Sequence, residues 1–186
     1  MRNIDAPQAF SRIEFREDVM RVYRLALCAL VVCLAGVASA NEAPFLKSLA
    51  GSWTGGGMMK RTTASSPINL SCNFQSKANG EALSMDGKCT GMLVVSRAVS
   101  AQLTATSGSY AGRYIGPSGR VSSLNGARRG DAIELAVTWS RIVNGDRAAT
   151  MTIRRSGANA LRIRTVDKDP ASGKQVVTSE INLQRN

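Results

Sequence analysis

The sequence has no histidine, and only two of its four cysteines lie beyond residue 40. Most catalytic triads use an imidazole to move protons, and structural zinc sites use histidine or several cysteines as ligands. These absences predict that the chain is not an enzyme and holds no metal or other cofactor. Cation binding by Asp167 and Asp169 is an alternative, although the Pro170 that follows them is typical of a solvated turn.

Aromatic residues are also scarce, at 5% of the chain. A surface that stacks nucleic-acid bases needs more of them, so nucleic acid is not an expected partner. Two glycine-rich segments, GSWTGGG at 51–57 and GPSGR at 116–120, do not lead into helices. This excludes phosphate-binding loops of the kind that precede a helix.

Acidic residues are few beside basic ones, with 13 Asp and Glu against 24 Lys and Arg. The first 40 residues hold five arginines and four acids, so the remainder carries a net charge of +10. This excess favours an anionic partner, and it equally serves to keep a protein soluble.

Only one long apolar run is present, LALCALVVCLAGVA at 25–38. Two arginines precede it and small residues follow it, which together predict a signal peptide over 20–40 that is cleaved after Ala40. At about 14 residues the run is too short to span a membrane, which takes roughly 20. Because Met20 directly precedes the basic residues, we interpret residues 1–19 as an upstream extension.

We therefore expect a periplasmic or secreted protein with one domain over 41–186 and no transmembrane segment after cleavage. Cleavage leaves Cys72 and Cys89, and an exported protein with two cysteines favours a disulfide between them. A turn signal at Asn79 and Gly80 lies between the cysteines, so the bond would join neighbouring strands. Two free thiols or a metal-binding pair are the alternatives.

Beyond residue 50, apolar and polar residues alternate with a period of two, which indicates half-buried strands. The clearest case is DAIELAVTWS at 131–140, where one face carries Ile133, Leu135, Val137 and Trp139. Frequent turn signals predict an all-β protein, an antiparallel up-and-down barrel of about 8 to 10 strands without open edges. A two-sheet sandwich is the alternative. The segment APFLKSLAG at 43–51 predicts a short helical turn that plugs one end of the barrel.

Two places in the sequence resemble the lipocalins and the wider calycin superfamily. A short helical turn runs into Gly51-x-Trp53, and Arg185 lies near the end of the last predicted strand. The resemblance implies a barrel whose closed end holds Trp53 covered by Arg185, in a cation–π contact worth about 0.5 to 2 kcal/mol. The chain is also similar to small, uncharacterised periplasmic proteins of Gram-negative bacteria, which implies a location and a fold without an activity.

Two binding hypotheses follow. In the first, the barrel carries a small apolar ligand that is lined by the inward residues Met59, Leu135, Val137, Trp139 and Met151. Small residues at Gly55, Gly57 and Ala149 leave room for a cavity, whereas an interior filled by side chains would exclude one.

In the second hypothesis, outward arginines of an envelope protein bind an anionic glycan, a lipid or another protein. A hairpin turn centred at Gly157 and Ala158 places Arg154 opposite Arg162, with Arg164 next along the strand. Like charges across a strand pair repel each other, so this arrangement favours a bound anion. The same arginines also protect a strand against aggregation, which is the alternative reason for their presence.

Overall fold

The computed structural model describes residues 41–92 and 94–186. The predicted signal peptide and the extension before it lie outside the described residues. One short helix and ten strands follow each other along the chain: α2 (Ala43–Leu49), β1 (Gly51–Met59), β2 (Ile68–Asn79), β3 (Ala82–Gly91), β4 (Val95–Thr106), β5 (Ser109–Ile115), β6 (Val121–Arg129), β7 (Ala132–Val143), β8 (Asp146–Ser156), β9 (Ala160–Lys168) and β10 (Gln175–Arg185). In this part of the chain, no helix combines the length and apolarity needed to cross a membrane.

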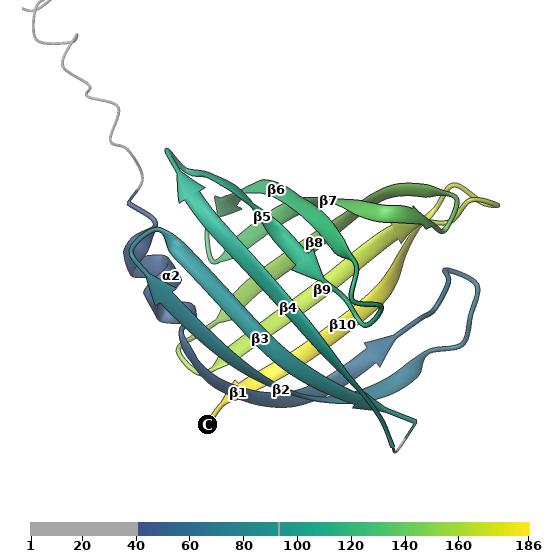
Figure 1. Ribbon diagram of the computed structural model, residues 1–186, viewed down its shortest axis with the longest axis horizontal. Helices are drawn as coiled ribbons and strands as arrows, with labels where there is room; N and C mark the ends of the chain where they lie inside the picture. Colours follow the sequence, from purple (N-terminus) through teal and green to yellow (C-terminus); the bar gives the residue numbers. More distant parts are fainter. Residues whose placement is uncertain (1–40, 93) are drawn as a thin grey trace, which may run out of the picture. The chain divides into compact units, whose positions relative to one another are not determined.

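The ten strands form one closed antiparallel barrel, in which each strand pairs with its sequence neighbours and β1 pairs with β10 (Figure 1). This confirms the predicted all-β, calycin-like barrel, and the two-sheet alternative is wrong. Closure pairs every strand on both sides and so removes the exposed edges of an open sheet. We call the end of the barrel that holds α2 the closed end, and the end with the loops 60–67 and 169–174 the open end.

Alternating side chains of the strands fill the barrel and form one continuous core. Trp53 and Leu183 are at most 1% exposed near the closed end. The helix α2 covers this end with Phe45, Leu46 and Leu49, whose spacing places them on one helical face. The burial of this apolar surface is the main source of stability and fixes the position of the helix.

Gly55 and Gly57 on β1 lie where the backbone of β10 comes close. A Cβ atom at Gly55 would lie 2.1 Å from the carbonyl oxygen of Asn182, and one at Gly57 would lie 1.9 Å from that of Glu180. No side chain fits at such distances, so glycine is required by the approach of the two strands. The approach of β10 therefore explains these two glycines, and their small size alone is no evidence for a cavity.

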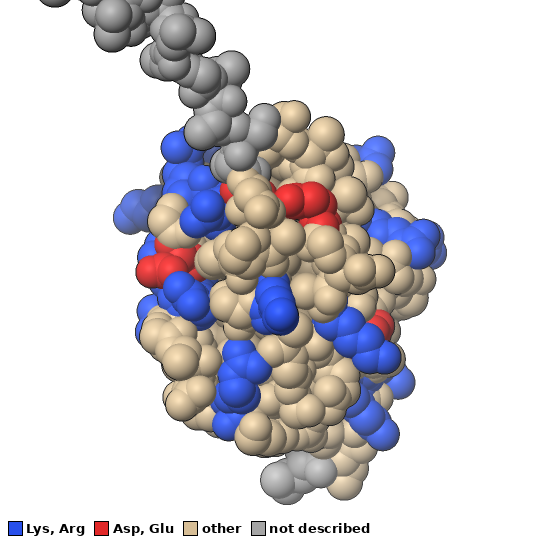
Figure 2. Space-filling model, turned by 90° about the vertical axis from the view of Figure 1, so that its left-hand side faces the viewer, with Lys and Arg blue, Asp and Glu red and all other residues tan. Residues whose placement is uncertain are grey.

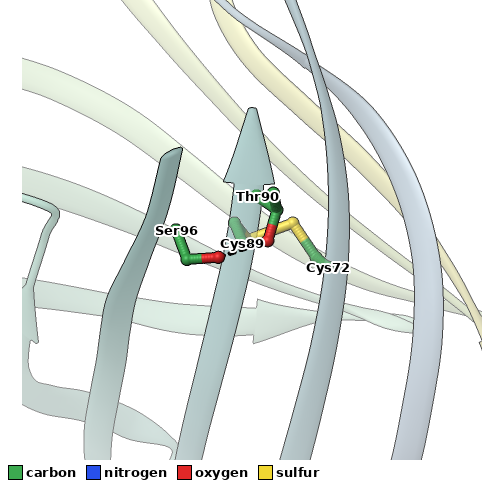
Figure 3. Close-up of a disulfide and its surroundings, with 4 residues drawn as sticks. All are labelled: Cys72, Cys89, Thr90 and Ser96. Atoms are coloured by element: carbon green, nitrogen blue, oxygen red, sulfur yellow. Dashed lines mark hydrogen bonds between the residues drawn. A yellow bond between two sulfur atoms is a disulfide. The ribbon is translucent and has the colours of Figure 1, made fainter. Parts of the chain in front are cut away.

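Cys72 on β2 and Cys89 on β3 are paired directly across the sheet and form the predicted disulfide (Figure 3). Both cysteines point into the barrel and are 0% and 8% exposed. On the next strand pair, the hydroxyl oxygens of Thr90 and Ser96 lie 2.6 Å apart in a hydrogen bond between β3 and β4. The disulfide is thus part of the core and joins neighbouring strands, as expected from the turn between the cysteines.

Candidate functional site at the open end of the barrel

Trp53 and Arg185 lie against each other at the closed end, as the family resemblance implies. The guanidinium carbon of Arg185 lies 4.2 Å from the centre of the Trp53 ring. Arg185 also donates hydrogen bonds to the carbonyl oxygens of Ser48 and Ala50, and the indole N–H of Trp53 donates to Leu49 O at 3.1 Å. The pair therefore fastens α2 to both the first and the last strand.

Glu42 fastens the start of α2, a role that sequence reasoning missed. Its carboxylate is 2% exposed and accepts hydrogen bonds from Tyr110 Oη at 2.7 Å and Arg128 Nε at 2.6 Å. Arg128 also lies over the Phe45 ring, 4.9 Å from its centre. Burial and the neighbouring Glu42 carboxylate raise the pKa of Tyr110, which keeps its hydroxyl protonated as a donor. Figure 2 shows this α2 face, where many Lys and Arg side chains lie with a few acidic ones between them.

Three of the predicted ligand-lining residues belong to the packed core. Leu135, Val137 and Met151 are 1%, 2% and 4% exposed, so neighbouring side chains fill the space around them. Met59 and Trp139 share the inward face but lie closer to the open end, and both are only partly buried. Side chains therefore fill the middle of the barrel, while inward side chains of the open half remain partly exposed.

A cluster of polar and aromatic side chains surrounds Trp139 on the inner wall of the open half. The indole N–H of Trp139 donates to Asp167 Oδ1 at 3.1 Å, and the Thr178 hydroxyl donates to the other carboxylate oxygen. Tyr114 lies edge-on to Trp139, with ring centres 6.2 Å apart, and burial raises the pKa of Tyr114 to about 12. We call Tyr114, Trp139, Asp167 and Thr178 the open-end cluster.

Simple alternation of apolar residues could not have identified this cluster completely. Thr178 is 7% exposed because the pairing of β10 with β9 shifts by one residue between Val177 and Ser179. Such a bulge breaks the period of two from which inward positions are inferred. Asp167 is 2% exposed although it is a carboxylate, and only the hydrogen bonds from its neighbours make that burial tolerable.

Asp167 and Asp169, considered above as cation ligands, have separate partners. Asp169 accepts hydrogen bonds from the backbone N–H and hydroxyl of Ser172 and from the Thr63 hydroxyl, which lies at 2.8 Å. These bonds lower the pKa of Asp169 from 3.8 to about 2. Among the described residues, no group of three or more acids and cysteines is arranged to hold a metal ion. Asp169 instead organises the turn of 169–174, as the Asp-Pro sequence indicates.

The loop 60–67 reaches from β1 to the neighbouring turns of the open end. The backbone N–H of Thr63 donates to Asn144 Oδ1 at 3.1 Å in the turn between β7 and β8, and the Thr63 hydroxyl binds Asp169. On the other side of the loop lies a pocket of about 620 Å³, which is lined by Arg61, Ser65, Ser66, Pro67, Ile68, Asn69 and Met92. This pocket adjoins the barrel wall because Ile68 pairs directly with Met59.

The outward arginines adopt the register that the hairpin at 157–159 predicts. Arg154 lies opposite Arg162, and all three of Arg154, Arg162 and Arg164 are exposed. Two of them have partners on β10 that were not foreseen. Arg162 Nε donates to Asn182 at 2.9 Å, and Arg164 forms an ion pair with Glu180 at 3.5 Å. The charge of Arg164 is therefore partly balanced, while that of Arg154 and Arg162 is not.

Comparison with known proteins gives information on the fold alone. No protein-family model matches the sequence, and a search of curated proteins finds no match. Among solved structures, the S-type phycobiliprotein lyase CPES from Guillardia theta is similar, with a TM-score of 0.52 and 12% sequence identity. The match covers 81% of this chain and 94% of the lyase chain. The chain has a calycin-like barrel fold.

The likeness also corrects one expectation. The absence of histidine was used to predict that the chain is not an enzyme, but a protein with a similar barrel is named a lyase. The prediction that the chain is not an enzyme is therefore wrong as an exclusion. Function has to be argued from the side chains at the open end.

Proposed function

We propose that the protein binds a small apolar ligand at the open end of its barrel. The observation that carries this proposal is the change in packing along the barrel axis. Side chains fill the barrel at Leu135 and Met151, whereas Met59 and Trp139, which lie nearer the open end on the same inward face, remain partly exposed. A surface depression of about 620 Å³ lies at the same end, beside loop 60–67, and is separate from these inward side chains.

The open-end cluster supplies the aromatic wall of such a site. Both oxygens of Asp167 already accept one hydrogen bond, from Trp139 and from Thr178. Asp167 and Thr178 are 2% and 7% exposed, so they hold the Trp139 indole in place and do not contact a ligand themselves. The ligand that fits is therefore an apolar molecule, held between the partly exposed aromatic and aliphatic side chains of Trp139 and Met59. The likeness to a lyase supports the fold on which the proposal rests, and no residue is assigned a catalytic role.

The proposed place of action is the periplasm or the exterior of the cell. Disulfides persist in oxidising compartments, and the bond between Cys72 and Cys89 is compatible with such a compartment. The signal peptide inferred from residues 20–40 would direct export, and the domain 41–186 would be the mature protein. Intact mass of the exported protein tests this point, since it reports both the cleavage site and the disulfide.

The two tryptophans allow a direct test of ligand position, because Trp53 lies at the closed end and Trp139 at the open end. The variants Trp53→Phe and Trp139→Phe each keep one of them. A brominated alcohol, 11-bromoundecanol, quenches indole fluorescence only in close contact. We expect saturable quenching of Trp139 in the first variant and none of Trp53 in the second.

Undecanol without bromine is the matched control and should quench neither variant. Equilibrium dialysis of the bromoalcohol against both variants checks that each still binds it. Quenching of Trp53, or equal quenching of both tryptophans, would contradict binding at the open end. Absence of any saturable binding would contradict the ligand proposal altogether.

A second candidate function rests on the outward arginines. Arg154 and Arg162 lie opposite each other without an acidic partner among the described residues, an arrangement that favours a bound anion. In this case the protein would bind an anionic glycan, lipid or protein through the β8–β9 face. Binding to heparin resin that is lost in the variant Arg154→Ser with Arg162→Ser, and retained in Lys77→Ser, would support it.

A further inference from the structure

We infer that the open end of the barrel docks on a membrane surface that contains anionic lipid. Two sets of side chains at this end carry the inference: exposed aliphatic residues on separate hairpins, and basic residues without acidic partners. The inference goes beyond ligand binding, because it concerns the outer tips of the loops and not the inner wall.

Exposed large apolar side chains occur only at the open end in the described part of the chain. There are five of them: Met92 at 61%, Val94 at 83%, Val95 at 44%, Val121 at 54% and Ile142 at 67% exposed. They lie on three different hairpins, β3–β4, β5–β6 and β7–β8, at or next to the turns. Grouped exposure of apolar residues on one side of a soluble domain marks an interaction surface.

Basic residues are interspersed with these apolar tips. The exposed ones at the open end are Arg61, Arg97, Arg120, Arg141, Arg147, Lys168 and Lys174. None of them takes part in the four ion pairs found among the described residues, which involve Arg128, Arg129, Arg155 and Arg164. The acids exposed beside them are Asp146 and, in part, Asp169, so the open end carries a clear positive excess.

This combination fits a lipid surface better than a folded partner. Valine, isoleucine and methionine at hairpin tips can enter the boundary between headgroups and acyl chains, while flanking arginines remain among anionic headgroups. The core of a protein interface is depleted of charged residues and enriched in aromatic ones, whereas these aliphatic tips belong to separate hairpins with charges between them. Aromatic side chains, which would serve nucleic acid, are absent from these exposed tips as far as the structure describes them.

The arrangement also orients the molecule. Docking through the hairpin tips would turn the pocket beside loop 60–67 toward the lipid, and α2 at the closed end away from it. Loop 60–67 contributes to the same surface, because Arg61 contacts the sulfur of Met92 at 3.7 Å. An apolar ligand could then pass between lipid and barrel without crossing water.

Vesicle flotation of the oxidised protein tests the inference. We expect flotation with vesicles of phosphatidylcholine that contain about one quarter phosphatidylglycerol, and much less with phosphatidylcholine alone. The variant Val94→Ser with Ile142→Ser should weaken the binding constant about tenfold, and Arg61→Glu with Arg141→Glu by at least as much. The matched charge control Lys77→Glu, on an exposed residue of β2 near the closed end, should change it by less than about twofold.

Three outcomes would overturn the inference. The first is that the variant Val94→Ser with Ile142→Ser floats equally well with both kinds of vesicle. The second is that the natural chain floats with neither kind. The third is loss of flotation in Arg154→Glu with Arg162→Glu while the open-end variants still bind, which would place the contact on the outer β8–β9 face. Quenching of Trp139 by bromoundecanol is measured without vesicles, so failure of docking and failure of ligand binding remain distinguishable.

Discussion

The two ends of this barrel differ in whether their charged and apolar side chains find contacts within the chain. At the closed end, Arg128 pairs with the buried Glu42 and Arg185 stacks on Trp53, so both of these cations next to α2 have partners. At the open end, Arg61 and Arg141 have no acidic partner among the described residues. Interactions that are satisfied within the chain stabilise it, while unsatisfied ones remain available to another molecule.

The apolar residues follow the same division. Leu46 and Leu49 of α2 are completely buried against the barrel, whereas Val94 and Ile142 at the opposite end are mostly exposed. Exposed apolar side chains contribute nothing to folding, and they carry a risk of aggregation. We interpret the closed end as the structural half of the barrel and the open end as its binding half.

The largest expected effect separates the two tryptophans. Trp53→Ala removes a fully buried indole and its contact with Arg185, and should lower the free energy of unfolding by about 3 to 5 kcal/mol. Trp139→Ala removes a partly exposed ring and should cost about half as much. Urea unfolding of the oxidised variants measures both. Equal losses would contradict the division into a structural and a binding half.

The disulfide should rank next. Replacing Cys72 and Cys89 together by alanine removes a link between residues that are 17 positions apart. On a chain-entropy model, a loop of this size contributes about 3 kcal/mol, and the loss of packing in the core adds to it. Thermal and urea unfolding of the double variant are compared with those of the reduced natural chain. If the free energy of unfolding falls by less than about 1 kcal/mol in both the double variant and the reduced chain, the disulfide constrains the unfolded chain only weakly.

The buried ion pair of Glu42 can be compared with an exposed ion pair. Glu42→Gln leaves the Arg128 side chain without its anion and weakens the bond to Tyr110, which should cost about 1 to 3 kcal/mol. The control is Glu134→Gln, because Glu134 pairs with the exposed Arg129 and such surface pairs contribute about 0 to 1 kcal/mol. If urea unfolding shows that both variants lose the same small amount, the network under α2 is not an anchor.

The smallest effect concerns Asp169 and pH. Its pKa is lowered in the folded protein from 3.8 to about 2, so the folded state favours the ionised form. The resulting stability is present above about pH 4 and is lost as the pH falls toward 2. We expect Asp169→Asn to lower the melting temperature slightly at neutral pH and to have a much smaller effect at pH 2, where about half of the carboxyl groups are protonated in the folded state. A constant difference across this range would show that the hydrogen bonds to Ser172 and Thr63 do not depend on the charge.

Local patterns in the sequence were sufficient to predict the barrel fold. Alternation in β7 set Leu135 and Val137 inward, and the turn at Gly157 fixed the register that places Arg154 opposite Arg162. The contact between Trp53 and Arg185 followed from the family resemblance together with an even number of strands. The first two features depend on period and turn type, which can be read from neighbouring residues, whereas the contact of Trp53 with Arg185 is what the resemblance implies.

The open end could not be derived in the same way. The bulge that buries Thr178 leaves no mark in the alternation of β10, and the bond from Thr63 to Asn144 joins loops that are distant in sequence. The role of Glu42 has no signal in the sequence, because its partners Tyr110 and Arg128 become neighbours only after the barrel closes. The packing of the interior around Met151 likewise depends on distances between strands, which the sequence does not contain.

Hydrogen–deuterium exchange with and without saturating 11-bromoundecanol tests the division between the two ends most directly. The account predicts slower exchange in loop 60–67 and in the backbone around Trp139, with no change in α2 or in the turn 157–159. Protection of α2 would place the ligand at the closed end, and protection of the turn 157–159 would place it on the outer arginines. Either result would contradict the claim that the open end of the barrel is the binding site.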